Sequence, residues 1–224
     1  MILDLLRGGD IFDIIVGICA SAFFIFCVMP IHEYAHALIA YKLGDETARL
    51  SGRLTLNPMA HLNPIGALMI LLVGFGYGQP VPVNVRNVKM KNKKLAMGII
   101  ALAGPVSNLI MALISMLIMF ILLSVTTDPG LITLAFIVFF RFTAIININL
   151  AVFNLLPVPP LDGSRILFAV LPTKYYFSIM KYERYIMIGI MVLLFTGVLT
   201  KPLSMLSGFI YDLFQTVFSI IFLR

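Results

Sequence analysis

The stretch IFDIIVGICASAFFIFCVMPIHEYAHALIAYKL, from Ile11 to Leu43, decides the fold of this chain. It is longer than the roughly 20 apolar residues that a helix needs to cross a bilayer, so it predicts a tilted or projecting membrane helix. Inside it, residues 32–36 read His-Glu-Tyr-Ala-His. Ionisable side chains at membrane depth are costly and usually functional. This pentapeptide therefore also indicates where the chemistry lies.

His32 and His36 are four residues apart, so a helix presents both imidazoles on one face. Two neutral imidazoles at this spacing suit a divalent zinc ion, and Glu33 beside them suits a general base that takes a proton from water. The alternative is chance placement of a short pattern. The remaining motifs of the chain decide between the two interpretations.

The composition predicts an integral membrane protein. The 224 residues are 61% hydrophobic and 12% charged, with a mean hydropathy of +1.05, whereas soluble domains are near 45–50% apolar and about 25% charged. The net charge is +6, but twelve of the sixteen Lys and Arg lie in two segments, 42–94 and 165–184. The positive-inside rule places both segments in the cytoplasm. The charge therefore indicates topology and argues against a nucleic-acid partner.

The apolar runs predict a membrane all-α fold of about five spans in a single domain, residues 1–224. Five crossings with the first basic loop inside put the N-terminus outside and the C-terminus in the cytoplasm. After the motif helix at 11–43, the further spans are expected at 95–125, 131–156, 185–200 and 203–223.

The segment 45–93 has a different pattern. ARLSGRLTL (48–56) and VPVNVRNV (81–88) alternate with the two-residue period of strands. Between them, IGALMILLVGF (65–75) is too short to span a bilayer. We therefore expect a small β-sheet with a re-entrant element between the first two spans. The Lys-rich run at 89–94 predicts contact with lipid headgroups.

A catalytic zinc keeps three protein ligands and one open position, so a third ligand is needed. His61 is the only other histidine, and Asp162 lies in a Pro-rich break at the cytoplasmic end of a span. Both stay candidates at this point, together with other acids on that side. The predicted topology places four acids on the opposite side of the membrane: Asp4, Asp10, Asp13 and Asp128.

Three motifs together resemble the site-2 protease family of intramembrane zinc metalloproteases. They are HEYAH (32–36), AGPVSN (103–108) and NLLPVPPLDG (154–163), and the resemblance extends over about residues 30–165. The stretches NPMAHLNPIG and GYGQPVPVN are similar to the minimal bacterial and archaeal branch of the family, which lacks PDZ and CBS domains. Asn63 departs from this branch, where an Asp is expected.

The resemblance implies one Zn²⁺ per chain, bound by His32, His36 and Asp162, with Glu33 as the general base. It also implies that Asn108 and Asn154 hold the substrate backbone or stabilise the oxyanion. The implied activity is hydrolysis of peptide bonds in transmembrane segments of other membrane proteins, near the cytoplasmic face. The expected partners are therefore these substrates and the lipid bilayer, while the oligomeric state is not indicated.

Two other functions compete with this one. A zinc transporter or sensor is expected to have paired half-repeats with broken helices, and the sequence shows none. A catalytically inactive scaffold that binds membrane partners does not need a base beside a full ligand set. Individual residues also have structural alternatives: interhelical hydrogen bonds for Asn108 and Asn154, a helix cap for Asp162, and a turn contact for His61.

Overall fold

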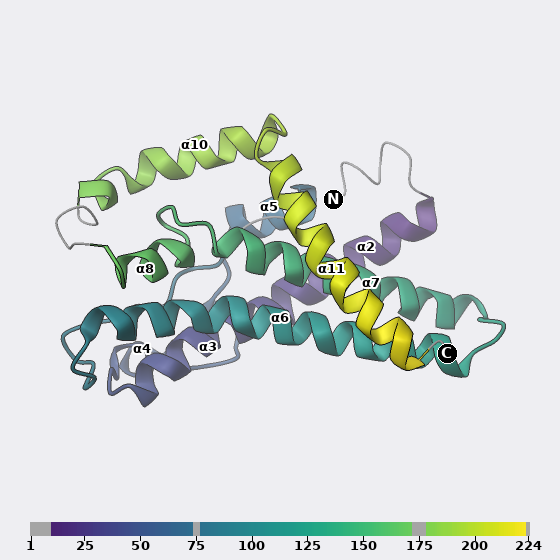
Figure 1. Cartoon of the computed structure of the whole chain (residues 1–224), viewed down its shortest axis with the longest axis horizontal. Helices are drawn as coiled ribbons and strands as arrows, with labels where there is room; N and C mark the ends of the chain where they lie inside the picture. Colours follow the sequence, from purple (N-terminus) through teal and green to yellow (C-terminus); the bar gives the residue numbers. More distant parts are fainter. Residues whose placement is uncertain (1–9, 74–76, 172–177, 223–224) are drawn as a thin grey trace.

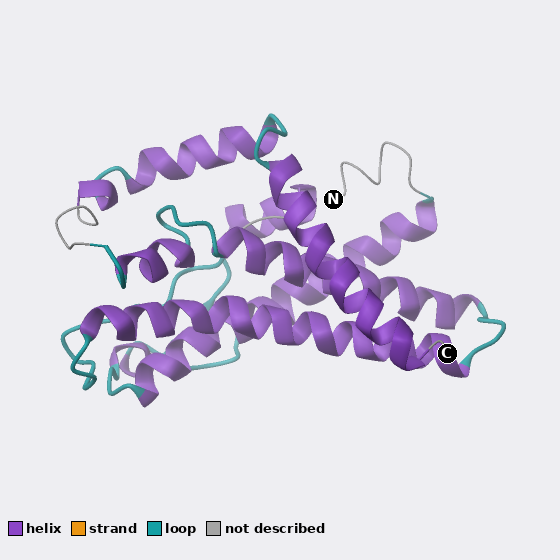
Figure 2. Cartoon of the chain, in the orientation of Figure 1, coloured by secondary structure: helices purple, strands orange, loops and turns teal. Residues whose placement is uncertain are grey.

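The computed structural model describes residues 10–73, 77–171 and 178–222. Every regular element in these ranges is helical (Figure 2). Four helical stretches are long and apolar enough to cross a membrane: Ile11–Lys42, Lys93–Val125, Leu131–Asn154 and Thr200–Phe222. The prediction of a helical membrane protein is thus confirmed, whereas the small β-sheet between the first two spans was wrong for the described residues.

The first span is continuous but changes pitch before the HEYAH motif. It consists of α2 (Ile11–Phe23), the π-helical turn η1 (Phe24–Val28) and α3 (Met29–Lys42). Pro30 lies in the first turn of α3, where its missing N–H disturbs the hydrogen bonds of the preceding turn. α3 then carries the two histidines on its buried side.

The centre of the bundle is an antiparallel pair, α6 (Lys93–Val125) and α7 (Leu131–Asn154). α6 follows the long axis of the molecule in Figure 1 and also packs against α3 and against α8 (Asp162–Phe168). Pro105 lies inside α6 without ending it, although its ring removes one backbone hydrogen bond. The three helices α3, α6 and α8 meet at one end of the bundle, and this junction contains the site.

The expected span at 185–200 was wrong. Its residues form α10 (Glu183–Phe195), which has 13 residues and a length of about 20 Å, too short to cross a bilayer. Gly197 has a φ of 80°, a left-handed conformation that ends helices and favours glycine. α11 (Thr200–Phe222) then follows as the fourth long helix.

Because α10 is too short to cross a bilayer, the number of crossings differs from the expected five, and this affects where the two ends of the described chain lie. The end of α11 packs against the end of α6, where Phe218 contacts the cluster of Met119 and Phe120. The start of α2 lies beside the start of α7, because Phe12 and Leu131 line one apolar groove. Both ends of the described chain therefore lie at the same end of the bundle, which corrects the expectation of opposite sides.

The segment expected to form strands contains short helices and an extended stretch. Residues 48–56 begin with α4 (Thr47–Leu50), and residues 81–88 are extended and then turn, without pairing. Pro80 and Pro82 have no N–H to donate to a sheet. The backbone N–H of Asn84 donates to the Asp45 side chain instead of to a strand.

The apolar run in this segment forms α5 (Pro64–Val73), a helix of 10 residues. The amide oxygen of Asn63 accepts hydrogen bonds from the N–H groups of Ile65 and Gly66. Asn63 is thus an N-terminal cap. Because an amide oxygen performs this role as an aspartate would, the departure from the family pattern at this position leaves the turn intact.

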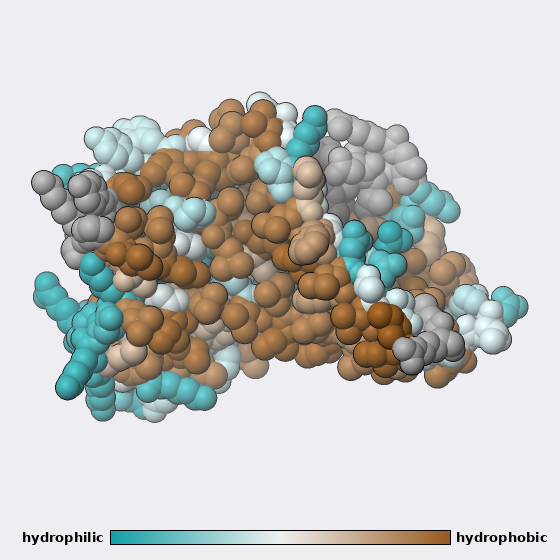
Figure 3. Space-filling model, in the orientation of Figure 1, coloured by the Kyte–Doolittle hydropathy of each residue, from teal (hydrophilic) through white to brown (hydrophobic). Residues whose placement is uncertain are grey.

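The surface agrees with a membrane protein. In Figure 3 apolar side chains cover most of the visible face, and hydrophilic ones gather at the end formed by α4 and the start of α6. This is the end of the bundle where α3, α6 and α8 meet. Segment 42–94, with its eight Lys and Arg residues, includes α4 and the start of α6 at this end.

Candidate metal centre

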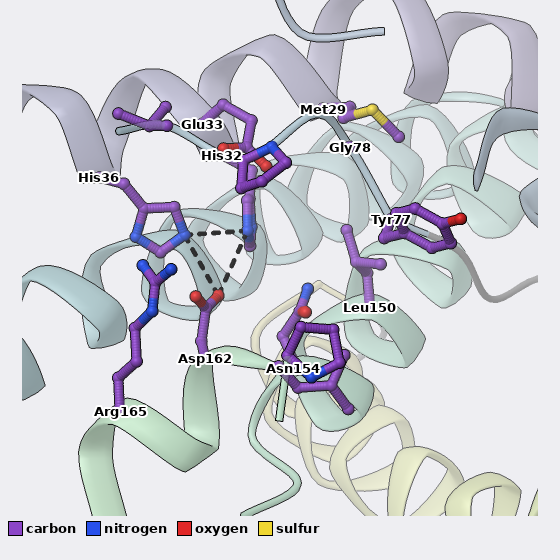
Figure 4. Close-up of a pocket in the computed structure, with 14 residues that line it drawn as sticks. Met29, His32, Glu33, His36, Tyr77, Gly78, Leu150, Asn154, Asp162 and Arg165 are labelled. Carbon is purple, nitrogen blue, oxygen red and sulfur yellow. Dashed lines mark hydrogen bonds and ion pairs between the residues drawn. The ribbon is translucent and has the colours of Figure 1, made fainter. Parts of the chain in front are cut away.

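Three predicted ligands, distant in the sequence, converge in the structure. The Nε2 atoms of His32 and His36 are 3.1 Å apart, and Asp162 Oδ2 lies 3.5 Å from the first and 3.1 Å from the second. Both histidines come from α3, and Asp162 is the first residue of α8. Figure 4 shows the three side chains pointing at one another.

The hydrogen bond made by Nδ1 of each imidazole determines which of the two ring nitrogens carries the proton. His36 Nδ1 lies 2.7 Å from the backbone carbonyl oxygen of Ile100, and His32 Nδ1 lies 2.8 Å from Oδ1 of Asn108. Both partners are acceptors, so each Nδ1 must carry the hydrogen that it donates. In the neutral imidazoles, both Nε2 atoms therefore present lone pairs to the centre of the site.

This arrangement fits a cation. Two imidazole lone pairs and a carboxylate oxygen facing one another repel unless a positive charge lies between them. Ligands 2.0–2.1 Å from a tetrahedral zinc stand about 3.3 Å apart, close to the distances of 3.1–3.5 Å between these three atoms. His32, His36 and Asp162 form the one group of this type among the residues that the structure describes.

The backbone of α6 leaves room for such an ion. A Cβ atom at Gly104 would lie 2.3 Å from His36 Nε2 and 2.6 Å from His32 Nε2, so any side chain there would enter the space between the ligands. The AGPVSN motif thus contributes a bare backbone at Gly104 and a hydrogen-bond acceptor at Asn108. Sequence reasoning quoted the motif but did not assign a role to its glycine.

The charge state of Asp162 is consistent with a ligand. Burial by itself would raise the pKa of this carboxyl group, but positive charge on the neighbouring His36 and His32 side chains, when no metal ion is bound, holds the pKa well below its ordinary value. The carboxylate is therefore ionised. Zinc and other divalent ions bind carboxylates in this form.

Glu33 and Asn154 face the same cavity as the ligands. The cavity has a volume of about 100 Å³. Glu33 is 7% exposed and Asn154 8% exposed, and neither side chain has a hydrogen-bond partner in the part of the chain that the structure describes. Gly78 lies so close that a Cβ there would be 3.0 Å from Glu33 Oε1. Glu33 therefore lies near the three ligands, and its carboxylate has no hydrogen-bond partner among the described residues.

Asn108 is placed differently from the expectation. It is fully buried behind His32, it is absent from the cavity lining, and its amide oxygen already accepts the His32 hydrogen bond. This position suits a residue that orients a ligand better than one that touches substrate. The substrate-binding role expected for Asn108 and Asn154 remains a prediction, and of the two only Asn154 borders the cavity.

The other candidate ligands have structural roles. His61 Nε2 donates to the carbonyl oxygen of Thr55, 2.8 Å away, which supports the turn contact weighed from the sequence. Asp45 accepts hydrogen bonds from Thr47, Asn84 and Asn87. Neither side chain belongs to the group around Asp162.

Arg165 was missed by the sequence reasoning. It lies one helical turn after Asp162 in α8 and lines the cavity, and Figure 4 shows its side chain extending toward the region of His36 and Asp162. Because residues three apart share a helix face, the spacing from Asp162 would have been sufficient to identify it.

Comparison with known proteins gives consistent relatives. The sequence model of peptidase family M50 matches residues 123–197. A candidate zinc metalloprotease of Bacillus subtilis strain 168, YwhC, is 42% identical over 196 residues, which cover 84% of this chain and 87% of the relative. A candidate zinc metalloprotease of Mycolicibacterium smegmatis, Rip2, is 34% identical over 146 residues, 59% of this chain and 50% of the relative. No solved structure matches.

Proposed function

Because the chain belongs to peptidase family M50, the site-2 protease family of membrane metalloproteases, we propose that it is an intramembrane zinc endopeptidase that cleaves transmembrane segments of other membrane proteins. One observation carries the proposal. Two histidine lone pairs and the Asp162 carboxylate converge beside an unpaired Glu33, in a cavity lined by α3, α7, α8 and residues 77–81.

The residues divide the chemistry between them. His32, His36 and Asp162 would hold one zinc ion, which supplies Lewis acidity toward a peptide carbonyl and lowers the pKa of water. Glu33 takes the proton of the attacking water and later delivers it to the leaving amine. The hydrogen bonds from His32 to Asn108 and from His36 to Ile100 keep both rings in place during these steps.

The size of the cavity defines the form of the substrate. A helix with its side chains is about 10 Å wide, which a cavity of about 100 Å³ cannot contain. The peptide bond of a transmembrane helix is also hidden in the hydrogen bonds of that helix. The substrate therefore has to unwind locally before its carbonyl reaches Glu33.

We place the site near the cytoplasmic face. α4 and the start of α6, which belong to the basic segment 42–94, lie at the same end of the bundle as the metal centre, and basic loops favour the cytoplasm. Since α2 begins and α11 ends at the other end of the bundle, both of these helix ends then face outward. In this orientation the lipid headgroups of the inner leaflet contact the basic end.

The test is Glu33→Gln in purified protein with a single-span model substrate. The amide cannot accept a proton, so cleavage should be abolished while the zinc content stays at the wild-type level. His36→Ala should lose both zinc and cleavage. Normal cleavage by Glu33→Gln would refute the role of Glu33. Zinc flux into sealed vesicles that survives the same substitution would favour a transporter.

A further inference from the structure

Arg165 is a cation at the edge of the cavity that contains the three ligands and Glu33. It follows Asp162 by three residues in α8, so the helix presents both side chains on one face. Figure 4 shows its side chain extending from α8 toward the region of His36 and Asp162, whose cavity it helps to line. The side chain is partly buried, with its charged end at the cavity.

The guanidinium has no partner of its own. Within residues 10–73, 77–171 and 178–222, Arg165 forms neither a hydrogen bond nor an ion pair, and Asp162 pairs with the two histidines instead. A guanidinium presents five N–H donors in a fixed plane. A partly buried Arg that leaves these donors unused beside a reactive centre is available for an anion.

The charges of the groups around the cavity indicate which anion Arg165 would bind. Zinc would bring two positive charges, which Asp162 and Glu33 neutralise, so Arg165 leaves one positive charge unmatched. Peptide hydrolysis moves one negative charge from Glu33 to the carbonyl oxygen, because Glu33 becomes neutral when it takes the proton of the attacking water. Water adds to the carbonyl carbon while Glu33 takes a water proton, and the carbonyl π electrons move to the carbonyl oxygen. That electron pair then returns, the C–N bond breaks, and the proton passes from Glu33 to the nitrogen.

We infer that the Arg165 guanidinium donates hydrogen bonds to the carbonyl oxygen as it becomes negative, and is thus a further catalytic residue. This inference rests on the proposed peptidase function. Asn108 cannot serve instead, because it is fully buried behind His32 and does not line the cavity. Asn154 borders the cavity but offers a neutral amide. A charged donor gives a stronger hydrogen bond to an oxyanion.

The experiment compares Arg165→Gln and Arg165→Lys with the wild-type protein. Arg184→Gln is the matched control, since Arg184 is an exposed Arg on α10 outside this cavity. Three quantities are measured in detergent: zinc content, kcat and KM for a single-span model substrate, and calorimetric binding of two peptides. One peptide carries a phosphinate, an anionic tetrahedral group, and the other carries an uncharged hydroxyethylene at the same position.

We expect Arg165→Gln to retain zinc and to lower kcat by about 100-fold with little change in KM, which is the loss typical of one oxyanion donor. Phosphinate affinity should fall in parallel, whereas hydroxyethylene affinity should not. Arg165→Lys should recover part of both losses, and Arg184→Gln should match the wild type.

Several outcomes would overturn the inference. Loss of zinc would make Arg165 a support for Asp162, an increase in KM alone would make it a substrate-binding residue, and equal binding of both peptides would remove the oxyanion role. Phosphinate binding needs no turnover, so it tests Arg165 even if the substrate is not cleaved. An inactive wild type or an active Glu33→Gln would instead count against the peptidase function.

Discussion

Asp45 and Asp162 both lie at the end of the bundle where α3, α6 and α8 meet, but their surroundings are opposite. Asp45 is fully buried and surrounded by donors: the N–H and O–H groups of Thr47, the N–H of Asn84 and the amide of Asn87. Asp162 faces two imidazole nitrogens whose protons are used on the other side of each ring.

The surroundings of the two carboxylates distinguish their roles: Asp45 stabilises the fold, whereas Asp162 is suited to bind a metal ion. A buried carboxylate with its lone pairs satisfied needs nothing further. A carboxylate opposite two other lone pairs needs a cation between them. The comparison also explains why burial and acidity alone, which both residues share, do not identify a metal ligand.

The largest expected effect is at Asp162. In Asp162→Asn the charge is lost and the amide N–H₂ can donate to the histidine Nε2 atoms, so zinc binding should be abolished while the fold is kept. Metal analysis and thermal unfolding of the zinc-free proteins measure this. Without zinc, the carboxylate pairs with the two histidines, so the variant should also be less stable than zinc-free wild type. Zinc binding that persists in the variant would contradict the ligand role of Asp162.

Gly104→Ala should have the next largest effect. The methyl group would lie 2.3 Å from His36 Nε2 and so occupy the space between the ligands. We expect zinc affinity to fall by at least about 100-fold, since the ligands would have to separate to admit both the methyl group and the ion. Gly189→Ala is the control, because a Cβ at Gly189 meets no atom within 4 Å. Its zinc affinity should be unchanged, as titration with a competing chelator would show.

Asn108→Ala tests the support of the ligands rather than the ligands themselves. The substitution removes the acceptor for His32 Nδ1, 2.8 Å away, so the imidazole can rotate or change its protonated nitrogen. Loss of such a partner typically lowers metal affinity about 10- to 100-fold. Chelator titration measures this change. If zinc affinity is unchanged and only KM rises, Asn108 touches substrate after all.

The smallest effect belongs to Asp45. Asp45→Asn places an amide N–H₂ opposite the donor N–H of Asn84, which should cost about 1–3 kcal/mol of unfolding free energy and leave zinc binding unchanged. Burial would raise the pKa of Asp45, but its hydrogen bonds from Thr47, Asn84 and Asn87 lower the pKa below 3.8.

A lowered folded-state pKa gives stability that is present above the unfolded pKa and lost as the pH falls through the folded value. Thermal unfolding from about pH 5 to pH 2 should therefore show a steeper loss of stability in the wild type than in Asp45→Asn. Parallel curves for the two proteins would contradict the role assigned to Asp45.

The sequence was informative where one local pattern dominates. Uninterrupted apolar runs predicted α6, α7 and α11 within a few residues, because length and hydropathy are sufficient to define a membrane helix. The i, i+4 spacing of His32 and His36 predicted their shared face. The third ligand needed more than a pattern, and it came from the resemblance around the LDG sequence at Asp162.

The predictions failed where distant contacts override a local pattern. The alternation at 81–88 suggested a strand, but Asp45 captures the N–H of Asn84, some 39 residues away in sequence, and the prolines at 80 and 82 cannot pair. In the run at 185–200, a single left-handed glycine, Gly197, ends α10 early. The part played by Gly104 depends on helix packing, which a single sequence does not reveal, whereas the three-residue spacing of Arg165 from Asp162 was a signal that the sequence reasoning did not use.

The bare backbone at Gly104 has an evolutionary consequence. On the α6 side, the metal site is bordered by the main chain of Gly104. Any substitution of this glycine adds a side chain that fills the space needed for the metal. Variation that adapts a relative to another substrate is then expected at other residues that line the cavity, such as Tyr77, Pro80 and Val81. The Gly104 side of the centre therefore has to keep its glycine, whereas the side chains that line the rest of the cavity can differ between relatives.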